Sequence, residues 1–178
     1  MAIKKILLYN SPTLRIPSEL INPGGINTER VKSLMLDLLD TMYSMPAYGV
    51  AAIQIGVPLQ MFCLDTAWNH ETGENQNPKI FMNPKILAQA EPTSFEEGCL
   101  SLPGGVVNTQ RNTRLLLEYM NMDGQVVTEE FTGITAIAIQ HEVEHLQGKL
   151  FIDDFGPIKQ SIVFKRMKKY LKNRKVRR

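Results

Sequence analysis

The chain has 178 residues, of which 43% are hydrophobic and 21% charged, a balance typical of one folded domain and not of a disordered or fibrous protein. It contains no uninterrupted apolar run of about 18 residues, the length that a membrane span needs, and no signal-peptide pattern at its N-terminus. The only two cysteines, Cys63 and Cys99, are too few for a disulfide framework. We therefore expect a cytoplasmic protein without a membrane contact. We also expect a monomer.

The formal net charge of +2 conceals a strong asymmetry along the chain. Residues 165–178 carry nine Lys or Arg and no acidic residue, whereas the other 164 residues carry eleven basic against eighteen acidic side chains. This distribution predicts that the tail, and not the body, meets a polyanion.

The first predicted helix begins after Asn27 or Thr28, either of which can cap it. From residue 31 to residue 42, apolar side chains recur at spacings of three and four, which predicts one buried helical stripe. Pro46 closes this region.

Two strands are predicted next. Residues 60–65 form an apolar run in which Cys63 reads as a small buried hydrophobe. After a polar loop over residues 69–78, a second run begins at residue 79, and Pro84 inside it predicts an edge or the end of a strand.

In the second half of the chain, strand-like runs over residues 114–119 and 125–131 flank an Asp-Gly pair, which predicts a hairpin. Residues 134–146 show helical periodicity, and Gly148 is a suitable residue to end that helix. Strands followed by a central helix predict an α+β fold, with mostly antiparallel sheets packed around that helix and a further C-terminal helix.

The segment His141-Glu-Val-Glu-His145 predicts a metal site. Residues four apart share one face of a helix, so both imidazoles can reach one ion, and Glu142 can handle the proton of a water beside it. Two solvated histidines are the alternative. The histidines, however, continue an apolar stripe that faces inward, where an unpartnered imidazole would be costly. The stripe consists of Ile134, Ile137 and Ala138.

A third protein ligand is needed, and no further histidine follows the pair closely. The only other histidine, His70, lies in a polar loop beside Trp68 and is expected at the surface. Cys99 is the better candidate. A thiolate with two imidazoles leaves a fourth position open, which is typical of catalytic metal sites.

Cys99 lies within Glu97-Gly-Cys-Leu-Ser101, and together with the His-Glu-x-x-His segment this block resembles the polypeptide deformylase family. A third block, Gly49-Val-Ala-Ala-Ile-Gln54, stands in the family's order. The resemblance covers nearly the whole chain and also includes Asn83-Pro84, Ser101-Leu-Pro103 and Asp123-Gly124. It implies an enzyme that removes the formyl group from the N-terminal formylmethionine of nascent polypeptides and releases formate.

The resemblance also implies the cofactor and the reacting groups. Cys99, His141 and His145 would bind one divalent ion, Fe2+ in the cell, with Zn2+, Ni2+ or Co2+ also accepted. Glu142 would act as the general base and then as the general acid.

The remaining implied roles concern the substrate. Gln54 and the backbone N–H of Leu100 would form the oxyanion hole, and the Gly49 backbone would hold the peptide as an added strand. The alternative for the apolar helix residues of the pocket is plain core packing. The side chains expected to line the methionine pocket are Tyr48, Phe95, Ile134, Ile137 and Ala138.

Four positions depart from the family pattern. Ala47 stands where a glycine is usual, Ile53 where a proline or small residue is usual, and residues 104–107 (Gly-Gly-Val-Val) where an arginine is common. Glu144 replaces the usual aspartate of the final helix. Arg111 is the expected partner of Glu144, and this pair would orient the ligand helix.

We divide the chain into a catalytic domain, residues 1–164, and a basic C-terminal helix or tail of the same domain, residues 165–178. The resemblance implies that this tail docks on the ribosome, and a solvated chain end is the alternative. Its helix would place Ile162, Met167, Tyr170 and Leu171 at apolar positions.

Two other functions compete with deformylation. One is a different metallo-amidase or peptidase, against which the Glu-Gly-Cys-Leu-Ser block argues. The other is a catalytically silent ribosome-binding member, against which Glu142, Gln54 and the intact ligand set argue.

Overall fold

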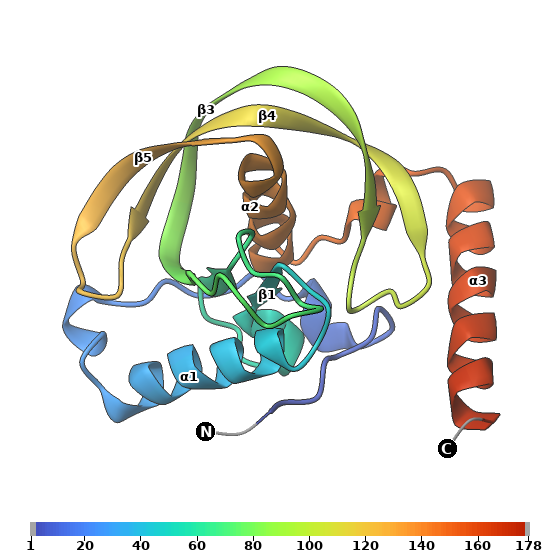
Figure 1. Ribbon diagram of the computed structural model, residues 1–178, viewed down its shortest axis with the longest axis horizontal. Helices are drawn as coiled ribbons and strands as arrows, with labels where there is room; N and C mark the ends of the chain where they lie inside the picture. The colour runs from blue at the N-terminus through green and yellow to red at the C-terminus, as the bar shows by residue number, and fades with distance from the viewer. Residues whose placement is uncertain (1–2, 177–178) are drawn as a thin grey trace.

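A computed structural model describes residues 3–176 of the chain (Figure 1). Five strands form one antiparallel sheet in the order β1-β2-β3-β4-β5, which together with three α-helices confirms the predicted α+β class. The helices are α1 (Glu29–Tyr43), α2 (Gly133–Leu146) and α3 (Pro157–Val176). The strands are β1 (Gly49–Ala51), β2 (Met61–Leu64), β3 (Lys79–Gly98), β4 (Val106–Met120) and β5 (Val126–Thr132). The short 3-10 helices are η1 (Pro12–Arg15), η2 (Pro23–Gly25), η3 (Ala52–Ile55) and η4 (Phe151–Asp154).

Helix α1 begins where the capping signal predicted. The Thr28 hydroxyl accepts a hydrogen bond from the Val31 N–H at 3.4 Å, which satisfies one of the free donors of the first turn. The predicted stripe is buried, with Leu38 and Met42 fully inaccessible, and it packs on the core that includes Val50 of β1.

Strands β3 and β4 form a long hairpin that arches over α2 (Figure 1). The strand does not end at Pro84, because a bulge between Met82 and Lys85 takes up the proline, which has no N–H to donate. The pairing of β3 with β2 does end at Met82. Beyond Pro84 the strand is therefore an edge on that side, as the proline predicted.

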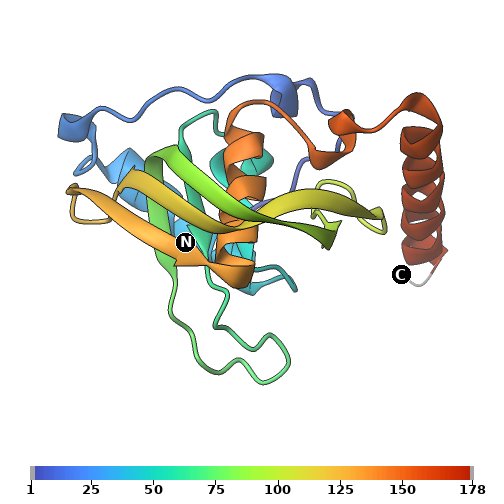
Figure 2. The ribbon, with the colours of Figure 1, turned by 90° about the horizontal axis from the view of Figure 1, so that it is seen from above.

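Helix α2 lies beneath the arch and carries part of the candidate site (Figures 1 and 2). Its apolar residues join a core with Phe62 and Phe81 of the sheet, whose rings stack at 4.7 Å. The helix ends before Gly148, which has φ +75; a Cβ there would lie 2.7 Å from the Arg15 carbonyl oxygen. This glycine is needed for its conformation and for close packing.

Helix α3 lies at one end of the molecule, beside the turn between β3 and β4 (Figures 1 and 2). The predicted C-terminal helix is confirmed for residues 165–176 and begins earlier, at Pro157; residues 177–178 lie outside the described part of the chain. Of the predicted apolar positions, Met167 is buried, whereas Ile162 and Tyr170 are exposed. The division at residue 164 stays a prediction.

The glycines at residues 104 and 105 explain one departure from the family pattern. A Cβ on Gly104 would lie 2.8 Å from the Tyr170 Cβ, and one on Gly105 would lie 2.7 Å from the Val163 Cγ1. Side chains at these positions would push α3 off the turn. Within residues 3–176, no helix is long and apolar enough to cross a membrane.

We expect Gly105→Ala to lower the free energy of unfolding by about 1–3 kcal/mol, because the added methyl group overpacks the contact with Val163. Urea denaturation measures this change. Gly25→Ala is the control, since a Cβ there meets nothing within 4 Å. Equal stability of the two variants would contradict the tight docking of α3.

Candidate metal centre

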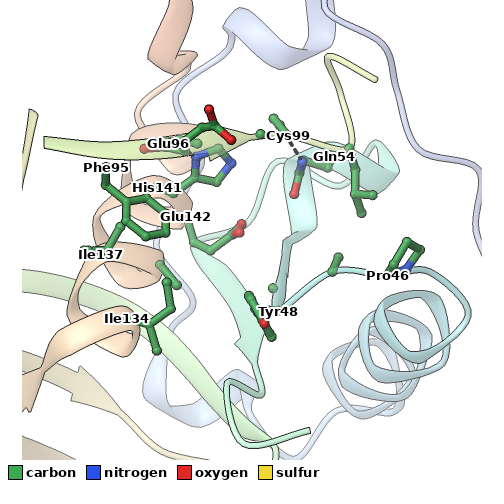
Figure 3. A pocket seen from close by; sticks show the side chains of 16 residues that line it. Pro46, Tyr48, Gln54, Phe95, Glu96, Cys99, Ile134, Ile137, His141 and Glu142 are labelled. Carbon is green, nitrogen blue, oxygen red and sulfur yellow. Dashed lines mark hydrogen bonds and ion pairs between the residues drawn. The ribbon is translucent and has the colours of Figure 1, made fainter. Parts of the chain in front are cut away.

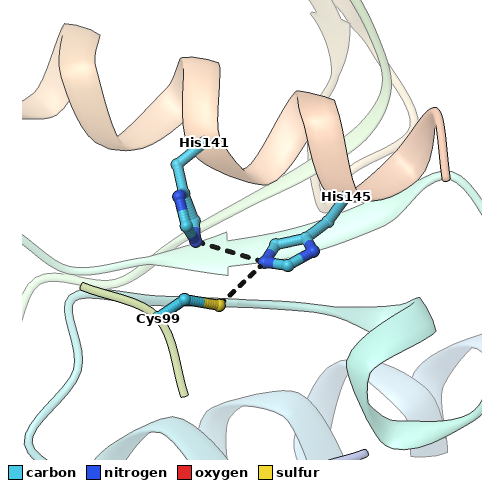
Figure 4. A group of neighbouring side chains, drawn as sticks. All are labelled: Cys99, His141 and His145. Carbon is cyan, nitrogen blue, oxygen red and sulfur yellow. Dashed lines mark hydrogen bonds between the residues drawn. The ribbon is translucent and has the colours of Figure 1, made fainter. Parts of the chain in front are cut away.

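Three potential ligand atoms converge beneath the arch (Figure 4). Cys99 directly follows β3, and His141 and His145 lie one turn apart on α2. The Cys99 Sγ lies 3.2 Å from the His145 Nε2, which lies 3.1 Å from the His141 Nε2. The structure thus brings together the three residues that the sequence predicted as ligands.

The donor set fits a divalent cation. Two imidazole nitrogens and a sulfur that face one another at hydrogen-bond distance present lone pairs to a common point. Burial lowers the pKa of His145 well below its ordinary value, so its ring is neutral, the form that binds metals. Burial also opposes the charged form of His141, but the neighbouring Cys99 sulfur and Glu97 outweigh it and raise the pKa of His141 well above its ordinary value. The surroundings of His141 therefore favour a positive charge beside the three potential ligand atoms.

Glu97 is a site residue that the sequence analysis did not assign. The His141 Nδ1–H donates a hydrogen bond to its carboxylate, which leaves the His141 Nε2 facing the other two potential ligand atoms. Burial opposes ionisation of Glu97, yet hydrogen bonds from His141 and Arg111 lower its pKa to about 2. Glu97 stands two residues before Cys99, and side chains two apart share a face of a strand. This spacing was the sequence signal that could have identified Glu97 as a site residue.

Arg111 of β4 joins Glu97 to helix α2. Its Nε and Nη2 donate to the two Glu97 carboxylate oxygens at 2.8 and 2.9 Å. Its Nη1 and Nη2 also donate to Glu144, the latter at 2.8 Å, so the predicted pair of Arg111 and Glu144 is present. The Arg111 side chain is only 5% exposed. The longer glutamate at position 144 therefore still reaches the guanidinium.

Glu142 and Gln54 lie beside the ligands. Burial raises the pKa of Glu142 to about 7, and its Oε2 has no hydrogen-bond partner among residues 3–176. The Gln54 Oε1 accepts the Ala51 N–H at 2.9 Å, while its Nε2 donates to the Ser101 hydroxyl at 3.2 Å and lies 3.6 Å from the Cys99 Sγ. The amide of Gln54 is thus held with its donor toward the ligands.

Glu142 and Gln54 line a cavity of about 400 Å³ (Figure 3). Leu100 also lines it, and its backbone N–H donates to no acceptor within the described part of the chain. Ile137 is buried, whereas Ile134 is 37% exposed and Tyr48 41%, so the stripe on α2 passes from the core to the cavity wall. All predicted substrate residues line the cavity: Tyr48, Gly49, Phe95, Ile134, Ile137 and Ala138.

Gly49 presents its backbone toward the free edge of the sheet. The Asp65 N–H donates to the Tyr48 carbonyl oxygen, and the β1-β2 register is antiparallel. Because hydrogen-bonded pairs alternate in such a ladder, the N–H and C=O of Gly49 point away from β2. A Cβ on Gly49 would lie 2.8 Å from the Glu142 Oε1, so only glycine fits beside that carboxylate.

The other two departures from the family pattern differ in their consequences. Ala47 lines the cavity, whereas Ile53 is fully buried in the core with Phe62 and Phe81. The substitution at position 53 therefore affects packing, and the one at position 47 touches the cavity wall.

A cavity with a Cys-His-His donor set beside a buried glutamate is the arrangement of a metal-dependent hydrolase. Comparison with known proteins narrows this class. The model of the polypeptide deformylase family matches residues 3–161. The peptide deformylase of Phenylobacterium zucineum is 40% identical over 173 residues, which cover 97% of this chain and 99% of that protein.

Solved structures agree with the family match. A peptide deformylase from Legionella pneumophila superposes with a TM-score of 0.89 at 30% identity and covers 99% of both chains. A class I type b peptide deformylase from Acinetobacter baumannii, crystallised with Met-Ala-Ser bound, has a TM-score of 0.80 at 25% identity. The alignment covers 86% of this chain and 99% of that one.

The chain belongs to the polypeptide deformylase family. Enzymes of this metal-dependent family remove the N-formyl group from nascent polypeptides, and this is the activity of the chain.

We expect Arg111→Ala to lower the free energy of unfolding by about 3–5 kcal/mol, because it removes the guanidinium that pairs with the buried Glu97 carboxylate. Arg114→Ala, on the same strand, is the control and should cost much less, because its pair with Glu130 is exposed. Urea denaturation compares the two variants. Similar losses in both would show that the buried guanidinium is not the stabilising partner of Glu97.

Proposed function

We propose that Cys99, His141 and His145 bind one divalent metal ion, and that the formyl group is hydrolysed beside it. The observation that carries this proposal is the convergence of the three donor atoms, two of which, from Cys99 and His141, belong to residues that line the same cavity as Glu142 and Gln54 (Figures 3 and 4). A divalent ion held by these residues would act as a Lewis acid. It would lower the pKa of a bound water and polarise a carbonyl oxygen. Fe2+ is the ion we propose for the cell, and Zn2+, Ni2+ or Co2+ suit the same nitrogen and sulfur donors.

Glu142 acts as the proton carrier in this proposal. Its Oε2, which is without a partner among residues 3–176, accepts a proton from the attacking water. The water oxygen bonds to the formyl carbon, and Glu142 then delivers the proton to the leaving nitrogen as the C–N bond breaks. The products are formate and a peptide with a free α-amino group.

Gln54 and Leu100 stabilise the charge that develops on the formyl oxygen. The Gln54 Nε2 and the Leu100 N–H are donors that line the cavity near the ligands. The Ala51 N–H fixes the orientation of the Gln54 amide before substrate arrives. Donors placed in advance in this way need no reorganisation during the reaction.

The formylmethionyl peptide binds as an added strand along the free edge of β1. Gly49 offers its N–H and C=O there, adjacent to the Glu142 carboxylate. The methionine side chain enters the apolar part of the cavity formed by Tyr48, Phe95, Ile134, Ile137 and Ala138. The Met-Ala-Ser bound to the Acinetobacter baumannii relative supports this assignment, because it is the product of such a reaction.

Helix α3 supplies a contact with ribosomal RNA. The described cations from Lys165 to Lys172 are exposed, while the buried Met167 holds the helix against the body. Their attraction to phosphate is electrostatic and falls with salt. We propose that the chain works as a monomer in the cytoplasm, where nascent chains leave the ribosome.

We expect Glu142→Gln to lower the release of formate from formyl-Met-Ala-Ser by on the order of a hundredfold to ten-thousandfold, because the amide cannot carry the proton. The protein is prepared anaerobically, since a thiolate beside iron is prone to oxidation. The metal content of wild type and variant, measured by mass spectrometry, should be equal. Formate release at the wild-type rate would refute the role of Glu142, and metal-loaded wild type that releases none would refute the function.

We also expect a variant with four neutralised cations on α3 to bind ribosomes at least about tenfold more weakly at low salt and with a smaller salt dependence. The substitutions are Lys165→Gln, Lys168→Gln, Lys169→Gln and Lys172→Gln. Co-sedimentation with ribosomes measures the affinity.

The control for this variant removes the same charge from the exposed surface elsewhere. Its substitutions are Arg30→Gln, Lys32→Gln, Lys85→Gln and Lys149→Gln. Equal ribosome affinity of the two variants would mean that α3 has no specific part in binding.

A further inference from the structure

Four rings form a continuous row from helix α1 to the mouth of the cavity. The ring centroids of Tyr43 and Trp68 are 4.9 Å apart, and those of Trp68 and His70 are 5.4 Å apart. His70 in turn lies 5.3 Å from Tyr48, which lines the cavity. The histidine that the sequence placed at the surface is indeed exposed, but it also joins the buried Trp68 to a residue of the candidate site.

Asp65 holds the inner part of this row. The Tyr43 hydroxyl donates to its Oδ2 at 2.6 Å, and the backbone N–H of Trp68 donates to its Oδ1 at 3.0 Å. The Asp65 N–H donates to the Tyr48 carbonyl oxygen at 2.8 Å. One buried carboxylate residue thereby anchors the loop that carries Trp68 and His70 and also fixes the backbone of Tyr48.

The Tyr48 ring itself is less firmly held than its backbone. It is 41% exposed, and His70 is its one ring neighbour among the described residues. An aromatic pair at this distance contributes a favourable energy beyond its buried area. The contact with His70 therefore favours this position of the Tyr48 ring in the cavity wall.

The direction of the bound peptide places its later residues at Tyr48. The formyl end must reach Gln54 and Glu142, and Gln54 follows β1 in the chain. A peptide paired with Gly49 therefore runs antiparallel to β1, back toward Tyr48. Because a strand advances about 3.4 Å per residue, the residues after formylmethionine pass the Tyr48 ring.

We propose that His70 is a positioning residue that holds the Tyr48 ring as a contact surface for the residues after formylmethionine, which favours substrates with a large apolar or aromatic side chain there. This inference rests on the proposed mode of peptide binding at Gly49. It adds a substrate preference to that mode and assigns it to a side chain outside the cavity.

The test compares kcat/KM for formyl-Met-Phe-Ser and formyl-Met-Ala-Phe with kcat/KM for formyl-Met-Ala-Ser. The metal-loaded wild type should favour the phenylalanine peptides, and His70→Ala should reduce this preference roughly three- to tenfold, the range of one aromatic contact. The change should appear in KM, since His70 lies outside the cavity that holds the reacting groups. His70→Phe, which keeps a ring at the position, should restore the preference.

Glu71→Ala is the matched control, because Glu71 is the exposed neighbour of His70 in the same loop. It should keep the wild-type preference. An absent preference in the wild type, an unchanged one in His70→Ala, or a loss through kcat for all three peptides would overturn the inference while formate release still supports the proposed function. No formate from any peptide would refute the proposed function and this inference together.

Discussion

The buried guanidinium of Arg111 is the constraint on which the site depends. A charge removed from water is costly unless every donor finds a partner, and Arg111 meets this condition only when Glu97 and Glu144 are both in place. These residues come from β4, the end of β3 and α2. Their ion pairs therefore fix three elements relative to one another, and the same Glu97 carboxylate orients the ring of His141. The arrangement of the three potential ligand atoms depends on this network as much as on the helix that carries the histidines.

Local patterns predicted the elements whose causes are local. Thr28 and the stripe behind it predicted α1, the Asp-Gly pair predicted the β4-β5 hairpin, and the four-residue spacing of His141 and His145 predicted their common face. Features that depend on residues distant in the sequence could not be predicted from these local patterns. The continuation of β3 through Pro84 depends on a bulge and on pairing with β4, neither of which has a signature within that segment.

The same distinction holds within the site. Helical periodicity could not separate core from cavity wall on α2, because both are apolar and inward; the buried Ile137 and the half-exposed Ile134 have the same pattern. Glu97 was not predicted as a site residue, because its partners, His141 and Arg111, are distant in the sequence. His70 was correctly expected at the surface, yet its contact with the Tyr48 ring arises only when the loop folds back toward the start of β1.

Helix α3 and the loop after Cys99 belong to one small core. Val163 and Met167 pack with Leu102, and Cys99 borders the same cluster. A force applied to helix α3 therefore reaches, through side-chain packing alone, the segment that carries Cys99, a proposed metal ligand. A fusion partner or an immobilising tag at the C-terminus would transmit force to this core. An attachment point elsewhere on the surface would leave the loop after Cys99 undisturbed.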